Sequence, residues 1–320
     1  MKNFLSIESA TVAELHAVLA LAAEMKATRG RHAAHPLRHQ CWALIFSKSS
    51  TRTRVSFEVG IRELGGDVLF LSASEIQLGR GEPIKDTARV LGRMVHGAVI
   101  RTFAQSDVED FAKYSGIPTV NALTDEEHPC QIIADLQTIQ EKLGGYAGKV
   151  VTFIGDGACN MPASWLWAAS KLEFELRIAA PRAFQPAPEL IARAFPVVKT
   201  PAPAEGDAAA VYENARGGRL LITEDLDAAA TGADVLYTDV WVSMGKEDEA
   251  AYRAAQFARY QIDAALVAKA KPGALVMHCL PAYRGKEITE EVLEAHADTI
   301  FTQAENRLHA QKAILSLLAR

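Results

Sequence analysis

Hydroxyl and arginine side chains are concentrated in one short run, residues 47–54, which reads SKSSTRTR. The run follows an apolar segment and precedes an amphipathic pattern, in which Phe57, Ile61 and Leu64 recur at helical spacing. Backbone N–H groups at a helix start bind anions, hydroxyls cap the first turn, and arginine forks match phosphate oxygens. Basic residues are disfavoured at that end of a helix because they face its positive dipole. The run therefore predicts a phosphate site better than it predicts a solvated helix start.

Short apolar runs alternate with longer amphipathic ones, a pattern typical of βα units around a parallel sheet. We expect a first series of strands at 41–46, 68–71, 98–101 and 119–123, with helices such as 53–64 between them. A helix over 131–143 ends at Gly144 and Gly145, which indicates a domain boundary. A second series follows, with strands at 149–155, 175–180, 234–241 and 274–280 and a final helix over 306–318. The pattern predicts two open parallel-sheet α/β domains.

Length and composition agree with that prediction and exclude other classes of protein. The 320 residues are about twice a common domain size, and 49% of them are hydrophobic, which excludes a disordered or collagen-like chain. Thirty-four Lys and Arg stand against 39 Asp and Glu, a net charge of −5. No global basic field attracts nucleic acid or an anionic membrane, so we expect neither as a partner. On this count even a small anionic substrate looks unfavoured.

The cysteines and the N-terminus favour a cytoplasmic protein. Cys41, Cys130, Cys159 and Cys279 lie far apart, which is neither a disulfide framework nor a zinc site, and we expect no metal. Glu8 interrupts the apolar stretch that a signal peptide would need, and no run approaches the roughly 18 apolar residues of a membrane span.

Three further motifs follow the SKSSTRTR run in order. They are His128-Pro-Cys-Gln131, the segment 239–245 (DVWVSMG) and His278-Cys-Leu-Pro281. Together the four motifs resemble those of the aspartate/ornithine carbamoyltransferase family, from about residue 40 to the C-terminus. The last two resemble the amine-site motifs of the members that act on ornithine.

The resemblance implies a reaction, an assembly and a domain plan. The side-chain amine of L-ornithine would attack carbamoyl phosphate, giving L-citrulline and phosphate in arginine metabolism, either arginine biosynthesis or arginine breakdown, without a metal or organic cofactor. Residues 1–145 with about 304–320 would bind carbamoyl phosphate, and residues 146–303 would bind ornithine. The active site would lie in the cleft between the domains, with the C-terminal helix returning to the first. A homotrimer with shared sites is implied as well.

The resemblance also assigns residues to the two substrates. For carbamoyl phosphate it implies Ser50, Thr51, Arg52, Thr53, Arg54, Gln77 from a neighbouring subunit, Arg101, His128, Gln131, Cys279, Leu280 and Arg307. For ornithine it implies Asn160, Asp239, Ser243 and Met244, and for catalysis Arg101, His128 and Cys279. Cys279 and Asp239 would present the amine unprotonated, and the Leu280 carbonyl would receive the carbamoyl NH2.

The segment 155–161 (GDGACNM) departs from the family pattern, which has two adjacent asparagines. We assign the ligand role to Asn160, which directly precedes the apolar residue. The same strand and Gly155-Asp-Gly157 also suggest a dinucleotide site, hence a dehydrogenase. That interpretation is disfavoured because Asn160 replaces the third glycine and Asp156 would face the pyrophosphate.

Other interpretations stay open at this point. A carbamoyltransferase could act on aspartate, putrescine or N-acetylornithine, although Ser-Met-Gly and His-Cys-Leu-Pro favour ornithine. A regulator that only binds carbamoyl phosphate would be expected to have lost Arg101, His128 or Cys279, and all three are present. A nucleophilic role for Cys279 is chemically possible, but direct transfer in the family disfavours it.

Overall fold

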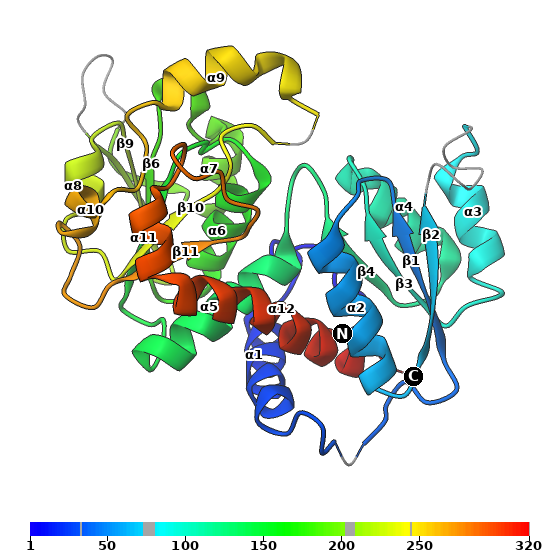
Figure 1. Ribbon diagram of the computed structural model, residues 1–320. Coiled ribbons are helices and arrows are strands. Elements are labelled where there is room, and N and C mark those ends of the chain that lie inside the picture. Colours follow the sequence, from blue (N-terminus) through cyan, green and yellow to red (C-terminus); the bar gives the residue numbers. More distant parts are fainter. Residues whose placement is uncertain (33, 73–80, 202–208, 244, 320) are drawn as a thin grey trace. The chain divides into compact units, whose positions relative to one another are not determined.

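The structure, a computed structural model, describes residues 1–32, 34–72, 81–201, 209–243 and 245–319. The chain forms two compact units, residues 1–137 with 305–320 (unit 1) and residues 138–304 (unit 2). The two boundaries between the units fall inside helices. The first lies in α5 (Pro129–Leu143) and the second in α12 (Ala297–Leu318), both labelled in Figure 1. Among the helices of the described residues, none is long and apolar enough to cross a membrane.

Unit 1 is built on a four-stranded parallel sheet in the order β2-β1-β3-β4. Its elements before α5 are α1 (Val12–Ala27), β1 (Cys41–Phe46), α2 (Thr51–Glu63), β2 (Asp67–Ser72), α3 (Ile84–Leu91), β3 (Gly97–Arg101), α4 (Gln105–Ser115) and β4 (Thr119–Leu123). The strands β1 and β3 are buried almost throughout, as expected where helices cover both faces of a parallel sheet. The four strands expected in this half are confirmed, with ends that differ by at most one residue.

Helix α2 begins two residues earlier than the apolar spacing predicts, because Ser50 caps it. The Ser50 hydroxyl accepts the backbone N–H of Thr53 at 3.3 Å, and the Ser50 backbone is extended, as at an ordinary N-cap. The hydroxyl-rich run thus ends on the first turn of this helix.

Helix α1 was not predicted, although its start carries a readable signal. Thr11 and Glu14 form a capping box, in which each side chain accepts the other's backbone N–H. Near the other end of α1, the Lys26 ammonium donates to Asn306 of α12 at 2.9 Å. The C-terminal part of α12, drawn in red in Figure 1, therefore belongs with unit 1, which confirms the expected return of the last helix.

A buried lysine anchors α12 to α2. Lys312 has a fully buried side chain, and its ammonium lies 2.5 Å from the Glu63 carboxylate and also contacts Nε2 of His32. Burial, followed by the positive charge of Lys312, lowers the pKa of His32, so the ring is suited to accept from the ammonium. Gly60 makes the approach possible, because a Cβ there would lie 3.1 Å from the Lys312 side chain.

Unit 2 is built on a seven-stranded sheet in the order β11-β10-β5-β6-β9-β8-β7. Its elements before α12 are β5 (Val150–Ile154), α6 (Asn160–Lys171), β6 (Glu175–Ala179), α7 (Pro188–Ala194), β7 (Val197–Thr200), β8 (Ala210–Glu213), β9 (Arg219–Thr223), α8 (Leu226–Ala230), β10 (Val235–Thr238), α9 (Ala250–Phe257), α10 (Ala264–Val267), β11 (Leu275–His278) and α11 (Glu290–Ala295). Five neighbouring strands run parallel, which confirms the expected α/β class.

The far edge of the second sheet differs from an all-parallel prediction. Strand β8 pairs antiparallel with both β7 and β9. Residues on β7 are exposed throughout, including Val197 and Val198, which suits an edge strand. Strand β7 lies within the stretch 185–206, which is rich in Ala and Pro and does not have the alternation that identifies strands.

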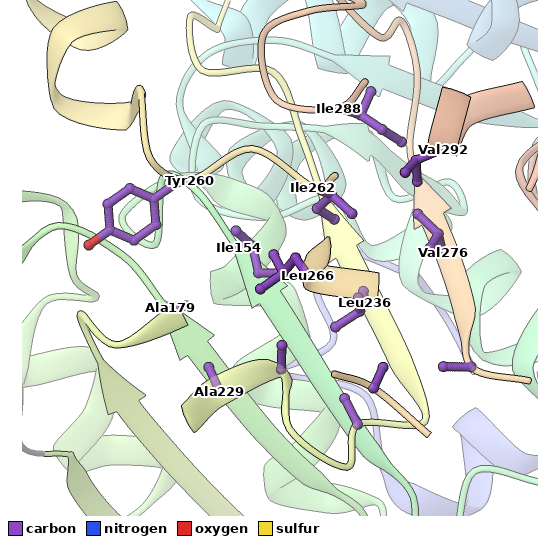
Figure 2. Packing of buried hydrophobic residues seen from close by; sticks show 14 of the residues in the cluster. Ile154, Ala179, Ala229, Leu236, Tyr260, Ile262, Leu266, Val276, Ile288 and Val292 are labelled. Carbon is purple, nitrogen blue, oxygen red and sulfur yellow. The ribbon is translucent and has the colours of Figure 1, made fainter. Parts of the chain in front are cut away.

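The core of unit 2 forms where helices and loops cover one end of the sheet. Figure 2 shows Ile154, Leu236 and Val276, from three adjacent strands, among Ile262 and Leu266. All five are at most 6% exposed, so this core contributes hydrophobic stabilisation of about 1.5–3 kcal/mol per large side chain. The strands that lead to the polar loops are therefore held by apolar packing.

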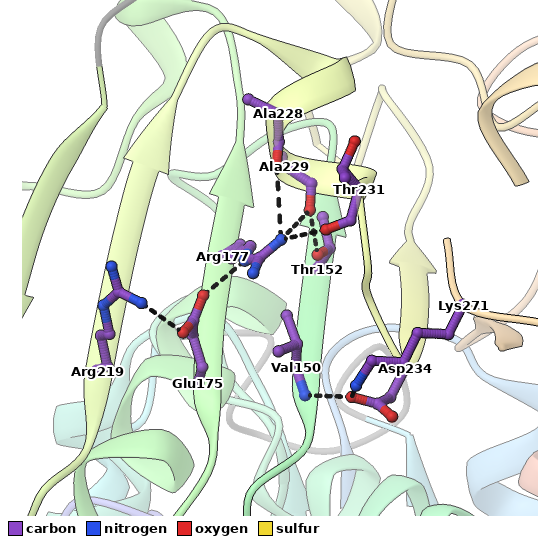
Figure 3. Close-up of polar contacts among 10 residues, drawn as sticks. All are labelled: Val150, Thr152, Glu175, Arg177, Arg219, Ala228, Ala229, Thr231, Asp234 and Lys271. Atoms are coloured by element: carbon purple, nitrogen blue, oxygen red, sulfur yellow. Dashed lines mark hydrogen bonds and ion pairs between the residues drawn. The ribbon is translucent and has the colours of Figure 1, made fainter. Parts of the chain in front are cut away.

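Charged residues on and beside the strands of unit 2 form ion pairs and hydrogen bonds with neighbouring helices and loops (Figure 3). Arg177 lies 2.6 Å from Glu175 and donates to the carbonyl groups of Ala228, Ala229 and Thr231 at the end of α8. Elsewhere in the figure, Asp234 accepts from the Val150 N–H and from Lys271. These contacts fasten helix ends and loops to the sheet.

Replacing Glu63 tests the anchor between α12 and α2. Partial burial acts to raise the pKa of Glu63, but hydrogen bonds and charges of Lys312 and Arg29 outweigh it, so the pKa lies below the ordinary 4.5. We expect Glu63→Gln to lower the free energy of unfolding at pH 7 by about 2 kcal/mol, because Lys312 loses its carboxylate while buried. A carboxylate whose pKa is lowered by folding stabilises the folded state at pH values above its ordinary pKa. This stabilisation is lost as the pH falls through the lowered pKa.

Urea unfolding at several pH values measures both effects. The difference between wild type and Glu63→Gln should shrink as the pH falls below 4.5. Asp86→Asn is the matched control, since Asp86 pairs with Arg89 on an exposed turn where ion pairs contribute little. Equal losses in the two variants would contradict a special role for the Lys312 anchor.

Candidate active site

The strand order of unit 1 directs polar residues to one edge of its sheet. From β1 the chain passes to β2 on one side and to β3 and β4 on the other, so the order reverses between β1 and β3. Ligands of open α/β sheets bind outside the carboxyl ends at such a reversal. Phe46 and Arg101 end these two strands as register partners, and the Ser47 N–H donates to the Arg101 carbonyl at 2.7 Å. The hydroxyl run and Arg101 therefore share the expected edge.

Three helices bring polar side chains together in unit 1. The Arg307 guanidinium of α12 donates to the Gln131 amide oxygen of α5 at 2.6 Å and to the Thr53 hydroxyl of α2 at 3.1 Å. Thr53 in turn accepts from the Ser50 hydroxyl at 3.0 Å. Gln131 is oriented from its other end, because its amide nitrogen donates to Asp135 at 2.8 Å. We call Ser50, Thr53, Gln131 and Arg307 the unit 1 cluster.

Two further basic residues lie beside this cluster. Arg101 and His128 are 5% and 6% exposed, and Arg307 is 4% exposed. Burial, followed by the charges of Arg307 and Arg101, holds the pKa of His128 well below its ordinary 6.5. At neutral pH His128 is therefore an uncharged imidazole, which carries one N–H donor beside two guanidinium groups. Such a site suits an anion with an adjacent carbonyl oxygen.

Three other residues of the run do not belong to the unit 1 cluster. Thr51, Arg52 and Arg54 are exposed on the first turn of α2. Arg54 lies over the ring of Phe70 and 2.6 Å from Glu58, one turn further along the helix. Only part of the predicted arginine set therefore converges in this structure.

The strand order of unit 2 reverses between β5 and β10. The chain leaves β5 for β6 on one side and later returns to β10 and β11 on the other. Beyond the carboxyl ends of these strands lie Gly155, Asp239 and Cys279, in that order. The polar residues predicted for the amine site thus come to one edge of this sheet as well.

Asp239 and Cys279 form a direct contact at that edge. The Cys279 thiol donates to the Asp239 carboxylate at 2.9 Å. Burial raises the pKa of Asp239, although the charge of His278 and the hydrogen bond from Cys279 act to lower it. The result is a carboxylate that is more basic than an exposed aspartate and suited to accept from an amine.

His278 completes a group of metal-ligand types with these two residues. Donor atoms of Asp239, His278 and Cys279 lie within 4.8 Å of one another. Both ring nitrogens of His278 are engaged, however: Nδ1 accepts the Leu280 N–H at 2.8 Å, and Nε2 lies 3.3 Å from Glu287. Binding of a metal by His278 would break one of these contacts.

The pair His278 and Glu287 supports the loop that follows β11. Leu280 has a backbone φ of 58°, which is unusual for a residue with a side chain, and its N–H is held by His278. Glu287 is fully buried and also accepts the Tyr283 N–H at 2.5 Å. Sequence reasoning missed Glu287, because it lies in the charged stretch 284–291 that reads as exposed.

The other predicted ligands of the amine lie near this edge or outside the described residues. Asn160 is the first residue of α6 and is partly exposed. Ser243 is partly exposed in a turn, where its carbonyl accepts the Lys246 N–H at 3.1 Å. Gln77 and Met244 lie outside the described residues, so their roles stay predictions.

Comparisons with known proteins give a consistent result along the whole chain. Residues 2–141 match the family model described as aspartate/ornithine carbamoyltransferase, carbamoyl-P binding domain, and residues 147–318 match its Asp/Orn binding domain. An ornithine carbamoyltransferase of Akkermansia muciniphila is 54% identical, with 100% of this chain and 98% of that protein covered. The crystal structure of ornithine carbamoyltransferase from Pyrococcus furiosus has a TM-score of 0.89 at 40% identity, covering 99% of this chain and 97% of that one. The corresponding structure of the anabolic enzyme from Campylobacter jejuni has a TM-score of 0.87 at 38% identity, with 99% of both chains covered.

Removing the Arg307 guanidinium tests the anion site. We expect Arg307→Met to weaken the binding of inorganic phosphate by about tenfold or more, because hydrogen bonds to a charged group contribute roughly 1.5–3 kcal/mol. Isothermal titration with phosphate at fixed ionic strength measures the change. Arg89→Met is the matched control, because Arg89 is exposed on α3 and pairs with Asp86. An affinity within about twofold of wild type would show that Arg307 does not bind the anion.

Proposed function

The chain belongs to the aspartate/ornithine carbamoyltransferase family, and we propose that it transfers the carbamoyl group of carbamoyl phosphate to the side-chain amine of L-ornithine. The products are L-citrulline and phosphate. The full-length 54% identity to an ornithine carbamoyltransferase carries this proposal. Residues 1–145 with about 304–320 form the carbamoyl phosphate domain in this proposal, and residues 146–303 form the ornithine domain.

Unit 1 supplies the groups that the phosphate half of the reaction needs. The leaving phosphate requires cations and hydroxyl donors, and the carbonyl oxygen requires donors as it gains charge. We assign the phosphate to Ser50, Thr51, Arg52, Thr53, Arg54 and Arg307. The carbamoyl group is assigned to Thr53, Arg101, His128 and Gln131. Neutral His128 supports this role, because an imidazole N–H can donate to the developing oxyanion without adding a charge.

Unit 2 supplies the groups that the amine half needs. Ornithine carries a charged side-chain ammonium at neutral pH, and only its neutral form can attack the carbonyl carbon. Asp239 is the group that accepts from this amine, and its raised pKa makes it a better acceptor. Cys279 holds that carboxylate, the Leu280 carbonyl receives the carbamoyl NH2, and Asn160, Ser243 and Met244 bind the amino-acid head.

A homotrimer in the cytoplasm completes the proposal, with Gln77 reaching the site of a neighbouring subunit. Exposed apolar side chains on unit 1 are compatible with an interface there. Val55, Leu69 and Met94 are 54%, 43% and 70% exposed.

A panel of amines with carbamoyl phosphate tests the acceptor. A colorimetric ureido assay should detect citrulline from ornithine and much slower turnover of aspartate, putrescine and N-acetylornithine. The reason is that Asp239 and Ser243 suit an acceptor that presents both an amino-acid head and a free side-chain amine. Turnover of another amine without citrulline formation would overturn the assignment to ornithine.

Replacing Cys279 tests its role as a support for Asp239. We expect Cys279→Ser to lower kcat by about tenfold to a hundredfold without abolishing turnover, since a hydroxyl still donates to the carboxylate but less well placed. Cys41→Ser is the matched control, as Cys41 is a free cysteine at the start of β1. Complete loss of activity, or a carbamoyl-thioester detected by mass spectrometry, would contradict the supporting role.

A further inference from the structure

A buried ion pair outside the residues assigned above joins two loops of the ornithine half-site. The Arg253 guanidinium of α9 lies 2.6 Å from the Asp156 carboxylate, and the two side chains are 5% and 2% exposed. Asp156 belongs to the loop that connects β5 with Asn160. Removing both charges from water is costly, and this cost is offset only where the geometry of the pair is good.

Asp156 shapes the loop on its own side of the pair. Its second carboxylate oxygen accepts the Ala158 N–H at 3.0 Å, which closes a local turn ahead of α6. Only glycine fits at position 157 of the same turn, because a Cβ on Gly157 would lie 2.8 Å from the Phe184 carbonyl oxygen. The path of the chain into Asn160 is therefore set by Asp156 and by the close backbone contact.

Arg253 holds the other loop. The same guanidinium nitrogen that meets Asp156 also donates to the Trp241 carbonyl at 3.3 Å, inside the segment 239–245. Its Nε donates to Glu249 at 2.7 Å, one turn earlier, where α9 begins. The Trp241 ring stacks on Phe257 of α9 with centroids 6.1 Å apart. Arg253 thus contacts the segment that contains Asp239 and Ser243 while it contacts the loop that ends at Asn160.

We propose that Arg253 is a positioning residue for ornithine, which fixes the spacing between Asn160 and Ser243 through its bonds to Asp156 and Trp241. This inference rests on the proposed function. A guanidinium suits the task because its planar fork bonds several acceptors at once in fixed directions, whereas a lysine ammonium on a flexible stem does not. Without the Arg253 guanidinium the two loops can move relative to each other, so the α-amino-acid group of ornithine loses one of its contacts.

Steady-state kinetics on Arg253→Lys and Arg253→Met tests the proposal. We expect the KM for ornithine to rise by about tenfold or more in Arg253→Met, and by less in Arg253→Lys, which keeps the charge beside Asp156. The KM for carbamoyl phosphate should stay within about twofold of wild type, because the residues assigned to its phosphate group lie in unit 1. Arg177→Lys and Arg177→Met are the matched controls, since Arg177 also joins a carboxylate and backbone carbonyls in unit 2 (Figure 3). These controls should lower the melting temperature without changing either KM.

A second variant keeps the test decisive if Arg253→Met does not fold. Asp156→Asn can still accept the Ala158 N–H, but its amide nitrogen replaces an acceptor of Arg253, so the same rise in the KM for ornithine is expected. If the Arg253 variants behave like the Arg177 controls, or raise both KM values equally, the positioning role is wrong. If wild type forms no citrulline from ornithine, the proposed function fails instead, and the two failures are thereby distinguished.

Discussion

All strands of a parallel sheet have their carboxyl ends on the same side of the sheet, and this constraint decides where the protein can do chemistry. Each sheet has a strand-order reversal of this kind, between β1 and β3 in unit 1 and between β5 and β10 in unit 2. Neighbouring loops diverge at a reversal, so side chains from distant parts of the sequence can converge there. Arg101 lies at the first reversal, and Asp239 at the second with Cys279 on the adjoining strand end. The strands that flank the two reversals, β1, β3, β5 and β10, are buried almost throughout.

Local charge at these edges depends on the kind of acceptor that each arginine meets. Arg307 donates to the neutral oxygens of Gln131 and Thr53, and these two bonds orient the guanidinium. Arg253 forms ion pairs with the carboxylates of Asp156 and Glu249, so its positive charge is compensated within the protein. The net charge argues against a polyanionic partner but says nothing about a site of a few residues.

Sequence patterns predicted eight strands of the described residues but missed β7, β8 and β9, several helix ends and the supporting residues. Strand β4 has the predicted bounds, because a short apolar run between turn residues leaves little choice. Helix α12 begins at Ala297, well before residue 306, since its first turns lack a clear apolar spacing and are fixed by tertiary contacts. The motifs identified the residues at both sheet edges, whereas Glu287 could not be found, because only the fold shows that one glutamate of a charged stretch is buried.

Asp156 has a structural role that the sequence alone does not show. An acidic residue between Gly155 and Gly157 argues against a pyrophosphate at that loop, and the sequence interpretation used it only in this way. In the structure the carboxylate is turned inward, where it accepts from Ala158 and Arg253. A phosphate-binding loop needs its backbone N–H groups free for the ligand, but here the Ala158 N–H is bonded to the carboxylate of its own loop. The glycines at this turn therefore allow a tight connection to α6. The Asp156 carboxylate binds Arg253, which contacts the neighbouring loop.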